Sequence, residues 1–190
     1  LQNLTAIQEK TIMANTTFSG PVISKNGFIG FGPGMSVNIN STGLGAQGLN
    51  LTVNDHAGKL LISQDADGIY TLPSINTNAN SVTAGATDYN NLNNIGASFH
   101  FYVETAATDM DILTDGTDKF KGGIMIAVDD GSKKAFIPGA TNDVITMNGS
   151  TKGGIVGSVV SFTAIDTATY LVHNSLLLGS GTIVTPYADA

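Results

Sequence analysis

Cysteine is absent from the chain of 190 residues, which excludes disulfides, thiolate nucleophiles and zinc–thiolate sites. Arginine is absent as well, so all eight basic residues are lysines and the formal net charge is −7. Arginine is the preferred side chain for bidentate contacts with phosphates and base edges. An acidic chain without arginine is therefore not expected to bind nucleic acid.

Charged residues and long apolar runs are also scarce. Charged residues make up 12% of the chain, about half of what is usual in soluble proteins. No apolar run approaches the ~20 residues that a membrane-spanning helix needs, so no membrane segment is expected. Glycine, threonine, serine, asparagine and alanine are abundant instead, which indicates a turn-rich all-β protein with a weakly charged surface.

Residues 1–55 are predicted to form an extended N-terminal arm. Glycine and proline are too frequent there for a compact core, and a glycine-rich strand specifies its register weakly. A short helix is an alternative for the first 14 residues. Two stretches alternate as half-buried strands do, namely Val37 and Ile39, then Leu49, Leu51 and Val53.

Residues 56–190 are predicted to form one β domain. Short β-prone stretches recur about every ten residues between Asp-Gly and Asn-Gly turns, which predicts an antiparallel β-sandwich or a jelly-roll-like barrel. The segment GKLLISQDADGIYTLP (58–73) is interpreted as a hairpin and the polar stretch 76–96 as a long surface loop.

The stretch NGSTKGGIVGSVV (148–160) resembles a phosphate-binding loop only in its glycines and its lysine. A phosphate loop places Lys-Ser/Thr after its last glycine and leads into a helix, whereas Lys152 here precedes Gly153 and a β-branched run follows. The stretch is therefore interpreted as a turn between strands.

The acidic residues and histidines show little of the spacing that catalytic or metal-binding motifs require. The cluster Asp109, Asp111, Asp115 and Asp118 fails the spacing of a calcium loop, and aspartate beside glycine usually initiates turns. An irregular calcium site is the alternative. His56, His100 and His173 lie far apart in the sequence without ligand spacing, and no nucleophile elbow occurs. No enzymatic activity, metal or cofactor is expected.

Several segments together resemble a recurrent domain of tailed-phage virion proteins, such as capsid decoration and head-fibre proteins. The resemblance covers about 130 residues well and the arm loosely. The segments are GKLLIS with ADGIYTLP (58–73), SFHFYVET (98–105), KGGIMIAVDDG (121–131) and the run from NDVITMNG to GSGTIVTPY (142–187). Tyr170 and Ser158 stand where this domain more often has Trp and Asp, and the loop 76–96 is longer.

The resemblance implies a non-enzymatic virion protein on the outer capsid surface, with the major capsid protein as partner, and commonly a homo-oligomer, here a dimer or trimer. The arm would contact the shell or sister subunits through its apolar anchors, since aromatic side chains dominate interface energetics. These anchors are Phe18, Val22, Phe28, Ile29 and Phe31. Packing of the same side chains on their own domain is the alternative.

Two other functions remain open at this point. A head or tail fibre could bind host-surface glycans through the loop 76–96 with Tyr89, although tryptophan, a frequent sugar-stacking residue, is absent. A depolymerase would need a pair of catalytic acids. Apart from the aspartates, of which the clustered ones are interpreted as turn residues, the only acidic residues are Glu9 and Glu104.

Overall fold

The computed structural model describes residues 35–77 and 93–190. The described residues all belong to one compact unit, Gly32–Ala190. In this described part no helix has the length and apolar character needed to cross a bilayer.

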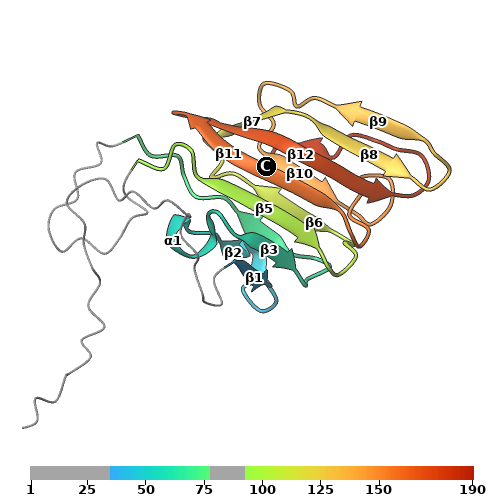
Figure 1. Ribbon diagram of the computed structural model, residues 1–190, viewed down its shortest axis with the longest axis horizontal. Helices are drawn as coiled ribbons and strands as arrows, with labels where there is room; N and C mark the ends of the chain where they lie inside the picture. Colours follow the sequence, from blue (N-terminus) through green and yellow to red (C-terminus); the bar gives the residue numbers. More distant parts are fainter. Residues whose placement is uncertain (1–34, 78–92) are drawn as a thin grey trace, which may run out of the picture. The chain divides into compact units, whose positions relative to one another are not determined.

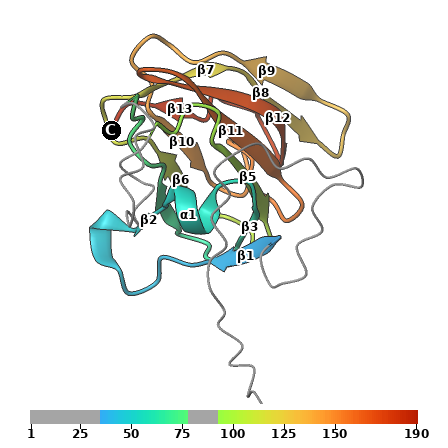
Figure 2. The same cartoon turned by 60° about the vertical axis from the view of Figure 1, so that its left-hand side comes forward.

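Two β-sheets form the two layers of a sandwich, seen from two sides in Figures 1 and 2. Sheet A has the order β1-β3-β5-β11-β12-β8-β9, and β7 also pairs with β12. Its strands are β1 (Ser36–Ile39), β3 (Leu60–Ser63), β5 (Ser98–Val103), β7 (Lys119–Gly122), β8 (Ile124–Val128), β9 (Lys133–Phe136), β11 (Val159–Asp166) and β12 (Thr169–Gly179).

Sheet B is smaller and has the order β13-β10-β6-β4-β2. Its strands are β2 (Leu49–Asn50), β4 (Ile69–Thr71), β6 (Met110–Leu113), β10 (Val144–Met147) and β13 (Tyr187–Ala188). Two short helical turns complete the described part, the 3-10 turn Gly45–Gln47 and α1 (Val53–His56).

Strands β1 to β6 alternate between the two sheets, and every neighbouring pair among them is parallel. In sheet A, β1 pairs with β3 and β3 with β5, while in sheet B, β2 pairs with β4 and β4 with β6. The expected hairpin at residues 58–73 is therefore wrong, because the turn after β3 carries the chain across to the other sheet. Tyr70 on β4 is fully buried and its hydroxyl lies 2.9 Å from Ser63 Oγ on β3, which joins the layers.

The second half of the domain contains antiparallel pairs, with β5 next to β11, β11 next to β12 and β8 next to β9, besides the parallel pairs that β12 forms. Turns at Asp130–Gly131 and Asp166–Ala168 close the β8–β9 and β11–β12 hairpins. Both sheets thus mix parallel and antiparallel strands, and the predicted all-β sandwich is confirmed.

Strand β12 changes partner along its length at an irregularity around Asn174. Its first half pairs with β7 and its second half with β8, both in parallel. The register with β11 shifts by one residue between the pairs Ser161–His173 and Val159–Leu176, and Asn174 has a φ of 45°. An extra residue of this kind is a β-bulge.

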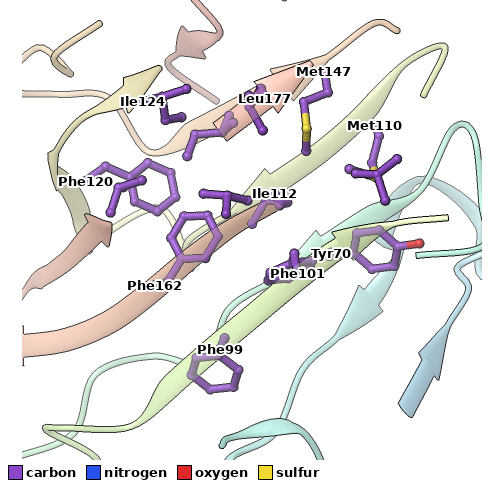
Figure 3. Close-up of a cluster of buried hydrophobic side chains, with 14 of the residues drawn as sticks. Tyr70, Phe99, Phe101, Met110, Ile112, Phe120, Ile124, Met147, Phe162 and Leu177 are labelled. Atoms are coloured by element: carbon purple, nitrogen blue, oxygen red, sulfur yellow. The ribbon is translucent and has the colours of Figure 1, made fainter. Parts of the chain in front are cut away.

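The core between the sheets is a chain of aromatic rings from both layers, several of which are labelled in Figure 3. Tyr70 of sheet B lies 5.9 Å from Phe101 of sheet A, centroid to centroid, and Phe101 lies 5.7 Å from Phe162. Phe120 continues the chain at 5.4 Å from Phe162. Burial of these large side chains is the main stabilising contribution of the core.

The residues from 36 to 55, assigned to the arm by sequence, contribute strands to both sheets. β1 and β2 appear at the two expected stretches, and Ile39 is buried in the core. The second stretch ends sooner than expected because Thr52 caps α1, its Oγ1 accepting a hydrogen bond from the amide of Asp55. The cap supplies a hydrogen-bond acceptor for an amide at the start of the helix, whereas the same amide in a strand would need an acceptor on a neighbouring strand.

The long polar loop is anchored at both ends by one side chain. Asn94 is 4% exposed, its Oδ1 accepts from the amide of Asn76 at 2.8 Å, and its Nδ2 donates to the carbonyl of Ser74 at 2.8 Å. Residues 78–92 of this loop, Tyr89 included, lie outside the described residues.

Candidate interaction surface

The five arm residues predicted to contact a capsid or a sister subunit all precede residue 35. Phe18, Val22, Phe28, Ile29 and Phe31 lie outside the part of the chain that the structure describes. Their role in contacts therefore stays a prediction.

The glycine-rich loop at 148–154 is a closed turn. Asn148 Oδ1 accepts hydrogen bonds from the amides of Ser150 and Lys152, and the Gly153 carbonyl accepts from the amides of Asn148 and Gly149. A Cβ on Gly149, whose φ is 64°, would lie 2.2 Å from the carbonyl oxygen of Ala107. These amides face the turn itself, so they are not oriented as a cradle for phosphate, and the interpretation as a turn is confirmed.

Aspartates at the turns accept hydrogen bonds from the amide two residues on, as expected for turn-initiating residues, and Asp65 also binds the loop after β1. Asp65 accepts from the amides of Ser41 and Asp67 and from the hydroxyls of Ser41 and Thr42. Burial alone would raise the pKa of Asp65, but these hydrogen bonds outweigh it and hold the pKa below its ordinary value.

Asp115 and Asp118, two members of the aspartate cluster noted in the sequence, lie in different environments. Burial would raise the pKa of Asp115, but hydrogen bonds from the Ser74 hydroxyl and from the amides of Asp118 and Thr117 outweigh it and lower the pKa. Asp118 is 3% exposed, and burial together with the charge of Asp115 raises its pKa. Among residues 35–77 and 93–190, no three acidic or histidine side chains come together as a metal ion would require.

One further buried acid lies just before β10 and binds the amide of Ala190. Asp143 is 6% exposed, accepts from Lys119 Nζ at 2.6 Å and from the amide of Ala190 at 2.8 Å. Burial would raise the pKa of this carboxyl, and the two donors more than offset that effect and lower it. The pair fastens β7 to the segment between β9 and β10.

The outward side of sheet A carries two rows of uncharged side chains across its central strands. Alternate residues of β3, β5, β11, β12 and β8 point into the core, so the intervening ones point away from it. The apolar row follows the strand registers through Ile62, Tyr102, Val159, Leu176 and Met125. The polar row beside it contains Leu60, His100, Ser161 and His173. These two rows are called the outer face of sheet A.

The polar row is held together by hydrogen bonds between side chains. His100 Nδ1 lies 2.9 Å from Ser161 Oγ, and His173 Nε2 lies 2.8 Å from Thr163 Oγ1. Burial and the nearby His100 both hold the pKa of His173 below its ordinary value. The imidazole of His173 is thus neutral at neutral pH, and the two histidines that the sequence separates by 73 positions share one surface.

The bulge at Asn174 gives this face its continuity. In a regular strand, residues three apart point to opposite sides. Because the bulge adds one residue, His173 and Leu176 both point outward while Val172 and Leu177 are buried. Beside the apolar row a hollow of about 340 Å³ is lined by Ala127, Leu178 and Ile155, among others.

Reasoning from the sequence missed this face. The alternation of Phe99, Phe101 and Val103 with His100 and Tyr102 indicates a strand with one side in water. The absence of Asp, Glu and Lys from the outward positions of five neighbouring strands is a property of the sheet, and it depends on a strand order that the sequence does not supply.

Comparison of the chain with family models, curated proteins and solved structures finds no match in any of the three.

Proposed function

We propose that the chain is a non-enzymatic structural protein of a bacteriophage virion, which binds the outer surface of the capsid and stabilises the shell. The observation that carries this proposal is that the polar residues which suggested chemistry have a structural role in the fold. The aspartates and the glycine-rich loop, which were the sequence's candidates for chemistry, fix the turns of a β-sandwich.

The resemblance to phage virion domains supplies the virion context. Its segments correspond to β3–β4, β5, β7–β8 and β10–β12, which include the central strands of sheet A and two strands of sheet B. The likeness therefore extends over the framework of the sandwich and not over a single exposed motif.

The shell contact is proposed for the arm, with Phe18, Phe28 and Phe31 as the aromatic anchors. Repeated binding at symmetric positions of a shell would multiply weak contacts by avidity. The major capsid protein is the partner in this proposal, and the outer capsid surface is the location.

The proposal is tested with virions of the phage that encodes the chain. Quantitative mass spectrometry should find a copy number comparable with that of the shell positions, and shells that lack the protein should bind the added chain and become more resistant to heat. A version that begins at residue 35 should keep the circular dichroism of the sandwich but lose shell binding.

Different results point elsewhere. A few copies per particle together with a hit on a glycan array would favour a fibre that binds the host surface. Shell binding that survives the deletion would move the contact from the arm to the described domain.

A further inference from the structure

The connection from β2 to β3 is the single helical turn α1, which Thr52 and His56 close from its two ends. Besides capping α1 with its side chain, Thr52 donates its own backbone amide to Nδ1 of His56 at 2.9 Å. In the other direction, the carbonyl of Thr52 accepts from the amide of His56 at 3.1 Å. Two hydrogen bonds therefore join these residues across the turn, and one of them depends on a titratable ring.

The bond from the Thr52 amide determines which form of His56 fits this geometry. A backbone amide can only donate, so Nδ1 has to be an unprotonated acceptor and the ring proton lies on Nε2. A proton on Nδ1 would place two donors against each other and would leave the Thr52 amide without its acceptor. The Thr52 hydroxyl is a poor replacement, because it lies 3.3 Å from Nδ1 and already forms two hydrogen bonds with Asp55.

The surroundings of His56 also favour the neutral ring. Burial of the half-buried imidazole is the largest effect, and it lowers the pKa of His56. Two charged side chains act on the ring in opposite directions, Asp55 from α1 itself and Lys59 from the start of β3, and the net result is a pKa below the ordinary value. The neutral ring that the hydrogen bond requires is therefore the form present at neutral pH.

The segment that α1 connects to the rest of the domain lies at the edges of both sheets. Within the described part of the chain, β1 pairs only with β3, and β2 pairs only with β4 over two residue pairs. Beyond β2, the amide of Leu51 still donates to the carbonyl of Thr71 at 2.8 Å, and Thr52 follows directly. Edge elements with few backbone hydrogen bonds open at a lower free energy than the centre of a sheet. The closed turn limits this opening, because it fixes the end of β2 close to β3.

We propose that α1 is a pH-sensitive clasp, which opens when His56 is protonated and then holds β1 and β2 less firmly on the sandwich. The pKa of His56 is lower in the folded protein than in an unfolded chain. The stabilisation is therefore complete above the unfolded pKa of about 6.5 and is lost as the pH falls through the folded value. This regulation of the fold goes beyond the virion role and does not rest on it, since it concerns one titratable residue of the free protein.

Hydrogen exchange of the full chain, followed by mass spectrometry, measures the opening directly. After correction for the intrinsic rate, exchange in the peptide that covers residues 49–57 should be about tenfold faster near pH 5 than at neutral pH, because one hydrogen bond corresponds to about that factor. Exchange in the β11–β12 hairpin should not change. In His56→Gln the acid response should disappear, because a glutamine oxygen can accept but does not titrate in this range. His100→Gln is the matched control, since it removes a histidine of β5, and it should keep the response.

A titration of the wild type by nuclear magnetic resonance gives a second result that does not depend on a variant's stability. The ring nitrogens of His56 should show the proton on Nε2 at neutral pH, and the Thr52 amide signal should shift with the same midpoint as the ring, below about 6.5. A proton on Nδ1, a midpoint at or above the ordinary value, or an acid response that survives in His56→Gln would overturn the proposal. So would equal acceleration of exchange in the β11–β12 hairpin, which would indicate general unfolding in acid.

Discussion

The bulge at Asn174 permits a prediction that reverses the usual preferences of a β-strand. Asn174 is exposed and has a φ of 45°, in the left-handed region, although it lies in the middle of the 11-residue strand β12. In a regular strand position, valine is more stable than glycine by up to about 1 kcal/mol. At a left-handed position the Cβ of an ordinary L-residue costs about 1–2 kcal/mol, and glycine does not have that cost.

The free energy of unfolding should therefore follow the order Asn174→Gly, wild type, Asn174→Val, from most to least stable. We expect glycine and asparagine to differ by less than about 0.5 kcal/mol, because asparagine tolerates this region, and valine to be lower by about 1–2 kcal/mol. Urea unfolding followed by circular dichroism measures these differences as shifts of the midpoint at constant slope.

Asn38 provides a matched control in the same sheet. It is an exposed asparagine within β1 and does not belong to the residues with positive φ. There the order should be the ordinary one, with Asn38→Val more stable than Asn38→Gly. If valine is as stable as glycine at position 174, the left-handed bulge is not a feature of the folded protein and the continuity of the outer face loses its explanation.

Two other features give sharp predictions. Asp143→Asn should lower the free energy of unfolding at neutral pH by about 1.5–3 kcal/mol, because a buried charge-assisted hydrogen bond to Lys119 is lost. The pKa of Asp143 is lowered in the folded protein, so this stabilisation is complete above the pKa of the unfolded carboxyl and is lost as the pH falls through the folded value. The two proteins should therefore converge in stability in acid, and equal stability at neutral pH would contradict the assignment. Gly149→Ala should cost more than about 2 kcal/mol, since its Cβ would meet the Ala107 carbonyl, while Gly131→Ala, with a φ of 85° and open space around it, should cost about 1 kcal/mol in the same urea titration.

The strands could largely be predicted from the sequence, because alternation of apolar residues is a local signal. Phe99, Phe101 and Val103 alternate with His100 and Tyr102, and the structure buries the first three. The pairing of strands could not be predicted in the same way. The turn after β3 has the composition of a hairpin turn, and only the long-range pairing of β3 with β5 and of β4 with β6 shows that it crosses between layers.

The errors at single residues have local physical causes. Val53 continues the alternation of Leu49 and Leu51, but Thr52 supplies a helix cap and the chain turns into α1. The alternation in β12 fails at Asn174 because of the bulge, so a strict period of two would have assigned Leu176 to the core and Leu177 to solvent. A bulge moves the side chains that follow it to the opposite face of the strand without changing the residue composition, so it is hard to recognise in a single sequence.

The bulge also determines which side chains of β12 lie on the outer face of sheet A. At the point where β12 leaves β7 and joins β8, Gly122 has a φ of 97° and a Cβ there would lie 2.1 Å from the carbonyl oxygen of Val172. Ser175 Oγ donates to the carbonyl of Gly123 at 2.7 Å, so the irregularities of the two strands are bonded to each other. A regular β12 would have kept an unbroken ladder but would have turned Leu176 and Leu178 into the core. Since the irregular backbone costs stability, its effect on the outward side chains, which places Leu176 on the outer face of sheet A, is a reason to keep it.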